Sequence, residues 1–251
     1  MHMDSKQKFY DSYHQKNKQF YKVIKRNNFT YYEILRFFYS EVMREIMVDI
    51  LEVKMLDIGC GVGTVSLYFA SLGADVIGID ISKRAINIAQ EAKKELGFKN
   101  INFSPKSLRK GRGKYDLVLT LEVIEHIEDE EQFLNMISSH LNNGGLLCLS
   151  TPLKENYLYK LGFYKTFDKE VGHLRRYTVA GIKNLLQNNG FTVLKWRRVE
   201  GPLRNLLFTT RLGFVIKFIR GPLIPIFHWL DWISMQLFGA TDVLVLARKD
   251  S

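Results

Sequence analysis

The stretch Val-Lys-Met-Leu-Asp-Ile-Gly-Cys-Gly-Val-Gly, at Val53–Gly63, decides the fold of this chain. It predicts a buried strand followed by a glycine-rich turn, and Thr64–Ser71 predicts a helix after it. A second predicted strand, Asp75–Asp80, ends in a carboxylate. A strand–turn–helix–strand unit of this kind lets backbone approach a nucleoside-bearing ligand and places an acid beside its ribose hydroxyls.

Two details of the turn bear on the nature of that ligand. The third glycine of a dinucleotide fingerprint would stand where this chain has Thr64. Asp57 lies two residues before the first glycine, and its negative charge would be costly beside a pyrophosphate. A positively charged adenosine ligand without phosphate fits better, and S-adenosylmethionine is such a molecule. The alternative is a NAD-type or purely structural turn.

The segment Leu56–Gly63 resembles the first motif of the class I S-adenosylmethionine-dependent methyltransferases, among them those of type 11. The resemblance implies that S-adenosylmethionine is the cofactor, that Asp80 binds its ribose and that Ile81 packs on adenine. It also implies backbone contacts after the third and fourth strands. The expected cofactor-binding residues are Asp57, Gly59, Cys60, Gly61, Gly63, Asp80, Ile81, Ser107, Leu108, Thr120 and Leu121.

Strand and helix patterns alternate along the chain, which predicts an α/β fold with a Rossmann-like, seven-stranded, mostly parallel sheet and helices on both faces. The resemblance implies that the last two strands form a hairpin with one antiparallel strand. Expected strands are Lys54–Ile58, Asp75–Asp80, Asn100–Phe103, Tyr115–Thr120, Gly145–Ser150, Thr192–Val199 and Asp242–Ala247. Expected helices are Glu33–Leu51, part of Lys6–Phe29, Thr64–Ser71, Ser82–Leu96, Glu130–Leu141 and Thr178–Asn189, with N-caps at Ser82 and Thr178.

These elements divide the chain into three expected parts. They are an N-terminal helical lid (1–50), a core (51–199 with 242–251), and an apolar helical insertion before the last strand (200–241). The two cysteines, Cys60 and Cys148, do not make a disulfide framework, and the first residues show no apolar signal-peptide region, so we expect a cytoplasmic protein. The net charge of +10 is spread along the 251 residues and names no acidic partner by itself.

An acidic–histidine group follows the fourth predicted strand, with Glu122, Glu125 and His126 in an E-x-x-E-H pattern. On a helical turn, residues three apart share a face, so the two carboxylates can converge beside the imidazole. This segment resembles that of the ubiquinone-biosynthesis O-methyltransferases, and the resemblance implies a Mg²⁺ site on these three residues. The alternatives are that His126 acts as a general base or seals the cofactor pocket.

A second candidate histidine lies in Gly172–Thr178, before a predicted helix at the carboxyl side of the sheet. His173 is expected to be a rival catalytic base, with Arg175 or Arg176 near the substrate. The alternative is that His173 caps the helix or binds loop carbonyls.

The insertion, 200–241, is apolar, with Trp229 and Trp232, and is interrupted by basic residues. Its apolar runs fall short of the ~20 residues that span a bilayer. One interpretation is an interfacial segment that contacts the membrane surface. The other is a helical subdomain that covers the sheet or forms a hydrophobic substrate pocket.

Together these features predict an S-adenosylmethionine-dependent methyltransferase that methylates an oxygen of a hydrophobic small molecule, such as a phenol, a quinone precursor or a lipid-like acceptor. The alternatives are an RNA methyltransferase, suggested only by the charge, or a non-catalytic S-adenosylmethionine-binding protein. Thr120–Val123 lacks the Asn/Asp-Pro-Pro-Tyr motif of amino-directed enzymes, which disfavours DNA methylation. We expect a small-molecule partner and a cytoplasmic or membrane-peripheral location.

Overall fold

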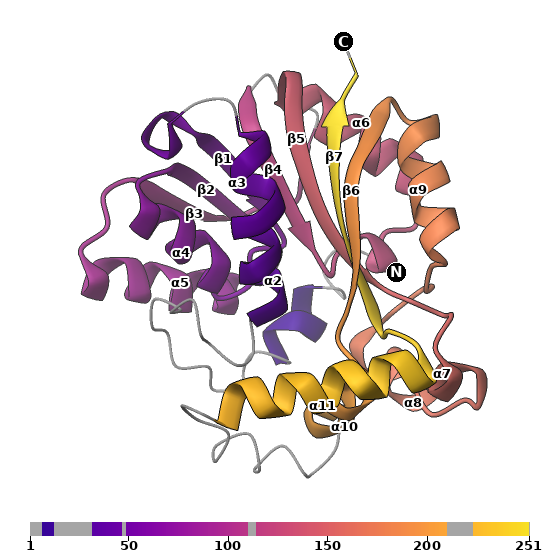
Figure 1. Cartoon of the computed structure of the whole chain (residues 1–251). Coiled ribbons are helices and arrows are strands. Elements are labelled where there is room, and N and C mark those ends of the chain that lie inside the picture. The colour runs from indigo at the N-terminus through magenta and orange to yellow at the C-terminus, as the bar shows by residue number, and fades with distance from the viewer. Residues whose placement is uncertain (1–6, 13–31, 47–48, 110–113, 210–222, 251) are drawn as a thin grey trace.

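The computed structural model describes residues 7–12, 32–46, 49–109, 114–209 and 223–250. Its centre is a seven-stranded sheet in the order β3-β2-β1-β4-β5-β7-β6 (Figure 1). The strands are β1 (Lys54–Ile58), β2 (Asp75–Asp80), β3 (Ile101–Pro105), β4 (Tyr115–Leu121), β5 (Leu141–Pro152), β6 (Phe191–Val199) and β7 (Asp242–Lys249). Only β7 runs antiparallel to its neighbours β5 and β6. The predicted fold class and the C-terminal hairpin are therefore confirmed.

Helices cover both faces of the sheet, as the alternating pattern predicts. On one face, α4 (Thr64–Leu72), α5 (Lys83–Leu96) and the N-terminal helix α2 (Tyr32–Phe37) share a hydrophobic core with β1, β2 and β4. On the other face, α6 (Glu130–His140) and α9 (Val179–Asn188) form a second core. The sheet therefore separates two apolar layers.

The predicted helix caps are present where the sequence places them. Ser82 Oγ accepts a hydrogen bond from the amide of Ala85 at 3.1 Å, and Thr178 Oγ1 accepts one from the amide of Gly181 at 2.9 Å. These bonds satisfy amides that the first turn of a helix leaves free. Helix α5 ends at Gly97, whose φ of 74° lies in the left-handed region that favours glycine.

The predicted helix Glu33–Leu51 is confirmed as far as Glu45 and is wrong beyond it. Helix α2 continues as a π-helix, η1 (Phe38–Val42), and then as α3 (Met43–Glu45). Ile46 is extended, with φ −69° and ψ 115°, and a 3₁₀ turn, η2 (Ile50–Glu52), leads into β1. Asp49 caps this turn by accepting the amide of Leu51 at 3.0 Å, so a local side-chain bond competes with the helical pattern.

The described residues of the N-terminal region make two separate sets of contacts. Residues 32–45 pack on the sheet, where Leu35 and Phe37 are fully buried and Glu41 pairs with Arg197 of β6 at 3.1 Å. Residues 7–12 are helical and are held near α5, because Asp11 accepts Ser82 Oγ at 2.6 Å. Most of the helical expectation for Lys6–Phe29 lies outside the described residues.

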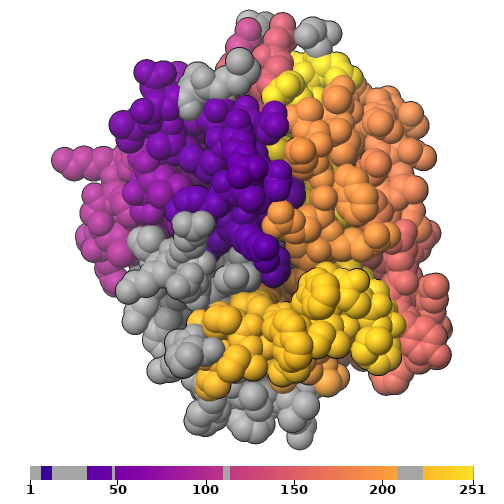
Figure 2. Space-filling model, viewed as in Figure 1, coloured from indigo at the N-terminus to yellow at the C-terminus, as the bar shows by residue number. Residues whose placement is uncertain are grey.

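Additional helices stand near the carboxyl ends of the strands. The loop after β5 contains α7 (Tyr157–Lys160) and α8 (Lys165–Val171), which the sequence pattern does not predict. The insertion contains α10 (Pro202–Thr209) and α11 (Leu223–Phe238), which lie across one end of the molecule (Figures 1 and 2). Within the described ranges, no helix is long and apolar enough to cross a membrane.

Candidate active site

The glycine-rich turn between β1 and α4 is shaped by its packing. Gly59 and Gly63 have φ values of 73° and 78°, where a side chain is strained. A Cβ on Gly59 would lie 2.4 Å from Cγ2 of Val123, and one on Gly63 would lie 2.5 Å from Cζ of Phe103. The turn can therefore approach both neighbouring strand ends only with glycine at these positions.

Asp80, at the end of β2, joins this turn to the next loop. Its Oδ2 accepts the amide of Gly61 at 2.9 Å, and its Oδ1 accepts the amide of Ser82 at 2.7 Å. Carboxylate oxygens can accept further hydrogen bonds in addition to these. Asp80 and Ile81 both border a cavity of about 890 Å³, which is in the range of small-molecule sites.

Asp57 and Cys60 lie behind the turn and do not border this cavity. Asp57 is buried, and its Oδ2 accepts the hydroxyl of Ser66 in α4 at 2.5 Å. Burial raises the pKa of Asp57 to about 7. Burial also raises the pKa of the Cys60 thiol. Asp57 thus links the end of β1 to helix α4, on either side of the turn.

The cavity collects many of the predicted residues from separate elements. Of the predicted cofactor residues it is bordered by Gly59, Gly61, Asp80, Ile81, Ser107 and Leu108, and Gly63, Thr120 and Leu121 lie outside its lining. Glu122, His126 and His173 also border it, and Phe9 and Tyr10 of the N-terminal segment contribute to its wall. The ring of Tyr10 meets His126 edge-on, with centroids 5.7 Å apart.

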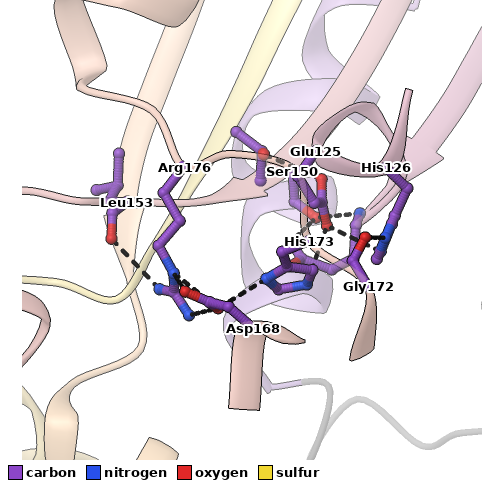
Figure 3. A network of polar contacts seen from close by, with 10 residues as sticks. Glu125, His126, Ser150, Leu153, Asp168, Gly172, His173 and Arg176 are labelled. Atoms are coloured by element: carbon purple, nitrogen blue, oxygen red, sulfur yellow. Dashed lines mark hydrogen bonds and ion pairs between the residues drawn. The ribbon is translucent and has the colours of Figure 1, made fainter. Parts of the chain in front are cut away.

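The structure groups Glu125 and His126 with His173. All three lie close to one another in Figure 3, where His173 comes from the loop after α8. Oε1 of the buried Glu125 is 3.7 Å from Nε2 of His126 and 3.9 Å from Nε2 of His173. Its Oε2 accepts Thr151 Oγ1 at 3.0 Å. Burial raises the pKa of Glu125 to about 8, so its carboxyl group is largely protonated at neutral pH.

Glu122 is not part of that group. It has a positive φ of 57°, and its Oε1 accepts the hydroxyl of Ser150 at 2.6 Å. Burial, and the nearby Glu125, raise the pKa of Glu122 well above its usual range. The expected Glu122–Glu125–His126 trio is therefore replaced by Glu125, His126 and His173, whose ligand atoms lie within 4.8 Å of one another.

This donor set does not suit Mg²⁺. That ion takes oxygen ligands in octahedral geometry, whereas the group offers two imidazoles and one carboxylate with a raised pKa. His126 also uses its Nδ1 to contact the carbonyl of Gly172 at 3.0 Å. We therefore assign no step to a magnesium ion.

His173 is held by a residue that the sequence pattern does not reveal. Its Nδ1 lies 2.9 Å from Oδ1 of Asp168 in α8. Arg176 donates Nε to both oxygens of Asp168, at 3.0 and 2.9 Å (Figure 3). Although burial opposes it, these hydrogen bonds lower the pKa of Asp168 below its usual range. The carboxylate thus stays ionised and fixes the orientation of the imidazole.

The two expected arginines therefore have different places. Arg176 borders the cavity and is buried, whereas Arg175 pairs with Glu130 at the start of α6. At the same end of the cavity, Glu200 and Asp242 were missed by sequence reasoning. They lie at the two ends of the insertion, and burial together with repulsion from Glu122 and Glu200 raises the pKa of Asp242 well above its usual range. Only the return of the chain from β6 to β7 brings these distant residues together.

The fold, the glycine turn and the carboxylate after the second strand define an α/β protein of the methyltransferase type. A profile of the family described as methyltransferase domain matches residues 22–195, and the chain belongs to this family.

Individual relatives match a smaller part. The ubiquinone biosynthesis O-methyltransferase of Pelagibacter ubique is 34% identical over 112 residues, which is 43% of this chain and 47% of that protein. The protein of the same name from a Caulobacter strain is 38% identical over 116 residues, or 43% of this chain and 46% of the relative. The chain thus spans about half the length of these curated relatives.

A solved structure supports the fold over nearly the whole chain. Magnesium protoporphyrin IX methyltransferase from Synechocystis, with bound SAH, has a TM-score of 0.60 and covers 99% of each chain at 20% identity. This likeness extends to the parts outside the family match. At this identity it bears on the fold alone.

Proposed function

We propose that this protein transfers the methyl group of S-adenosylmethionine to a hydroxyl oxygen of a hydrophobic small molecule. The observation that carries the proposal is that one cavity borders both the Asp80 turn and a histidine oriented by a carboxylate. Family membership supports the methyl transfer, and the names of the matched relatives support oxygen as the acceptor atom.

The nucleoside end of the cavity fits the cofactor by its chemistry. Asp80 offers carboxylate oxygens for the ribose hydroxyls, and Ile81 and Leu108 offer apolar surface for the adenine ring. The backbone of Gly59 and Gly61 leaves room for the methionine part. When bound, S-adenosylmethionine supplies a methyl group activated by a positively charged sulfur.

At the acceptor end, His173 is the proposed base. Because Asp168 holds its Nδ1–H, the lone pair of Nε2 is available to take the proton of an acceptor hydroxyl. His126, between Tyr10 and the Gly172 carbonyl, is the proposed sealing residue. Phe133, Met136 and Phe167 border the cavity and favour an apolar acceptor.

The charge of the cavity argues against RNA as the acceptor. Carboxylates of Asp80, Glu128 and Asp129 border it, and the lysine and arginine side chains there are Lys106 and Arg176 among the described residues. Arg176 is already bound to Asp168. A polyanion would therefore meet repulsion where its base must enter.

The test is a transfer assay with labelled S-adenosylmethionine and a panel of catechols, prenylated phenols, fatty acids and tRNA. We expect label on a hydroxylated hydrophobic compound. His173→Gln should lower kcat by about 10²-fold or more while cofactor affinity stays within twofold. His140→Gln, on α6 outside the cavity lining, is the matched control. Label on tRNA alone, or cofactor binding with no transfer to any compound, would overturn the proposal.

A further inference from the structure

Helix α11 has Asp231, Ser234 and His228 turned toward the protein. Asp231 is buried, and its two carboxylate oxygens accept the amides of Gly201 and Arg204 at 2.8 Å each. Ser234 accepts the amide of Leu203 at 3.3 Å, and His228 Nδ1 lies 2.6 Å from Nη2 of Arg204. The polar face of α11 therefore caps α10 and holds the fully buried Arg204.

The opposite side of α11, here called the outer face, is apolar and exposed. Trp229 and Trp232 are 59% and 54% exposed, and Leu237 is 71% exposed. The outer face comprises Leu223, Ile226, Trp229, Leu230, Trp232 and Leu237, with Gln236 as an exposed polar side chain among them. The ionisable residues of the helix, His228 and Asp231, both belong to the polar face. This is the reverse of an ordinary surface helix, whose apolar stripe faces the core.

The apolar surface continues beside the C-terminal end of α11. A Cβ on Gly239 would lie 3.2 Å from Cα of Asn156, so the start of α7 adjoins this end of α11 (Figure 1). From α7 to the start of α8, Tyr157, Leu161 and Phe163 are exposed. A continuous apolar patch of this kind marks an interaction site.

The charge around this patch selects the partner. Lys160, Lys165 and Lys169 are exposed on α7 and α8, against a single exposed carboxylate, Glu170, on these two helices. Exposed tryptophans with flanking lysines match the interface of a bilayer that carries anionic lipids, where indole rings lie at headgroup level. The net charge of +10 acts in the same direction.

We propose that the outer face of α11, with the adjoining α7 surface, docks on an anionic lipid membrane. Because α11 lies near the carboxyl ends of the parallel strands, docking through it would turn the cavity side of the molecule toward the bilayer (Figure 1). A hydrophobic acceptor dissolved in that bilayer would have a short path to the site. The docking itself is independent of methyl transfer.

The test is flotation of the full chain with vesicles of phosphatidylcholine alone and with added phosphatidylglycerol. We expect flotation with the anionic vesicles, weakened at least tenfold by the pair W229Q/W232Q. The chain has three tryptophans, so W196Q is a matched control. Trp196 is exposed on β6, and its ring makes cation–π contacts with Lys183 and Arg198.

The same variants allow a second measurement, by tryptophan fluorescence. In W196Q the remaining tryptophans both belong to the outer face, so their fluorescence should shift to the blue when anionic vesicles are added. In W229Q/W232Q no shift is expected. Circular dichroism and the affinity for S-adenosylmethionine should be unchanged in both, which separates docking from folding and from the proposed activity.

K160Q/K165Q/K169Q should reduce anionic binding while sparing the fold, since these side chains are exposed. The proposal is overturned if flotation survives W229Q/W232Q, or if binding to neutral vesicles is equally strong. It is also overturned if no vesicle binds while sedimentation shows a dimer that the same tryptophan pair dissociates, because the patch would then join two copies of the chain.

Discussion

The two ends of the cavity are built in different ways. The nucleoside end consists of turns that directly follow β1 and β2, and Asp80 connects these turns through two backbone amides. The acceptor end consists of side chains from distant segments, among them His126 after β4 and His173 after α8. The nucleoside end is therefore formed mainly by the backbone of these turns, and the acceptor end mainly by ionisable side chains.

This difference teaches where substitutions should act. A changed turn residue at the nucleoside end must disturb packing, because Gly59 and Gly63 touch Val123 and Phe103. A changed acid at the acceptor end alters protonation, because burial already raises the pKa of Glu122 and Glu125. Substitutions at the first end should thus act mainly through packing, and substitutions at the second end mainly through protonation.

The largest effect is expected from Gly63→Ala. The glycine has φ 78°, and the added Cβ would lie 2.5 Å from Phe103. The left-handed conformation costs about 1–2 kcal/mol, and overpacking adds about 1–3 kcal/mol. Gly97→Ala is the matched control, since its φ is 74° but nothing lies within 4 Å of the added Cβ. Urea unfolding should give a loss of stability that is clearly greater for Gly63→Ala, and equal losses would contradict the packing argument.

Asp80→Asn should have the next largest effect. Loss of the charged acceptor weakens hydrogen bonds worth about 1.5–3 kcal/mol, so the affinity for S-adenosylmethionine should fall roughly 10- to 100-fold. Asp75→Asn, at the opposite end of the same strand, is the control and should leave affinity unchanged. Calorimetric titration measures both. Unchanged affinity in Asp80→Asn would remove the ribose contact from the proposal.

The same contrast explains what the sequence could predict. The strand bounds Lys54–Ile58 and Asp75–Asp80 agree with the structure residue for residue, because glycines, apolar runs and caps are local signals. The loss of helix after Glu45 could not be read from periodicity, because the turn into β1 overrides it. Asp168, Glu200 and Asp242 gave no local pattern, and α8 and the β6–β7 return bring them to the cavity. His173 was predicted as a rival base, but its partnership with Glu125 needed the fold.

Most of the pH dependence of stability should come from the acceptor end, where burial raises the pKa values of Glu122, Glu125 and Asp242. The pKa of Glu125 is raised to about 8 in the folded protein and lies near 4.3 when unfolded. Between these values the folded state holds a proton that the unfolded state releases, so stability should fall as pH rises from about 5 to 8, by at most about 1.4 kcal/mol per pH unit. Glu125→Gln should flatten this slope, as measured by urea unfolding at several pH values.

Asp57 provides the comparison within the other end. Burial raises its pKa to about 7, so it contributes a slope of the same sign that ends about one pH unit earlier. In Glu125→Gln the slope should therefore become smaller, and the remainder comes from Asp57 and from Glu122 and Asp242, whose pKa values burial also raises. If the slope between pH 5 and 8 is as steep in Glu125→Gln as in the unmodified protein, Glu125 does not contribute to it.

The smallest effect is expected from chelation. If the nitrogen-rich group of Glu125, His126 and His173 serves proton transfer and sealing, then removing divalent ions leaves both roles intact, because Asp168 and Gly172 orient the two imidazoles without a metal. Transfer by EDTA-treated protein should stay within twofold of the untreated rate, and added Mg²⁺ should change it no further. A loss restored by Mg²⁺ would mean that Glu122 leaves Ser150 to join the group. The acceptor end would then depend on a bound metal ion and not on proton transfer and sealing alone.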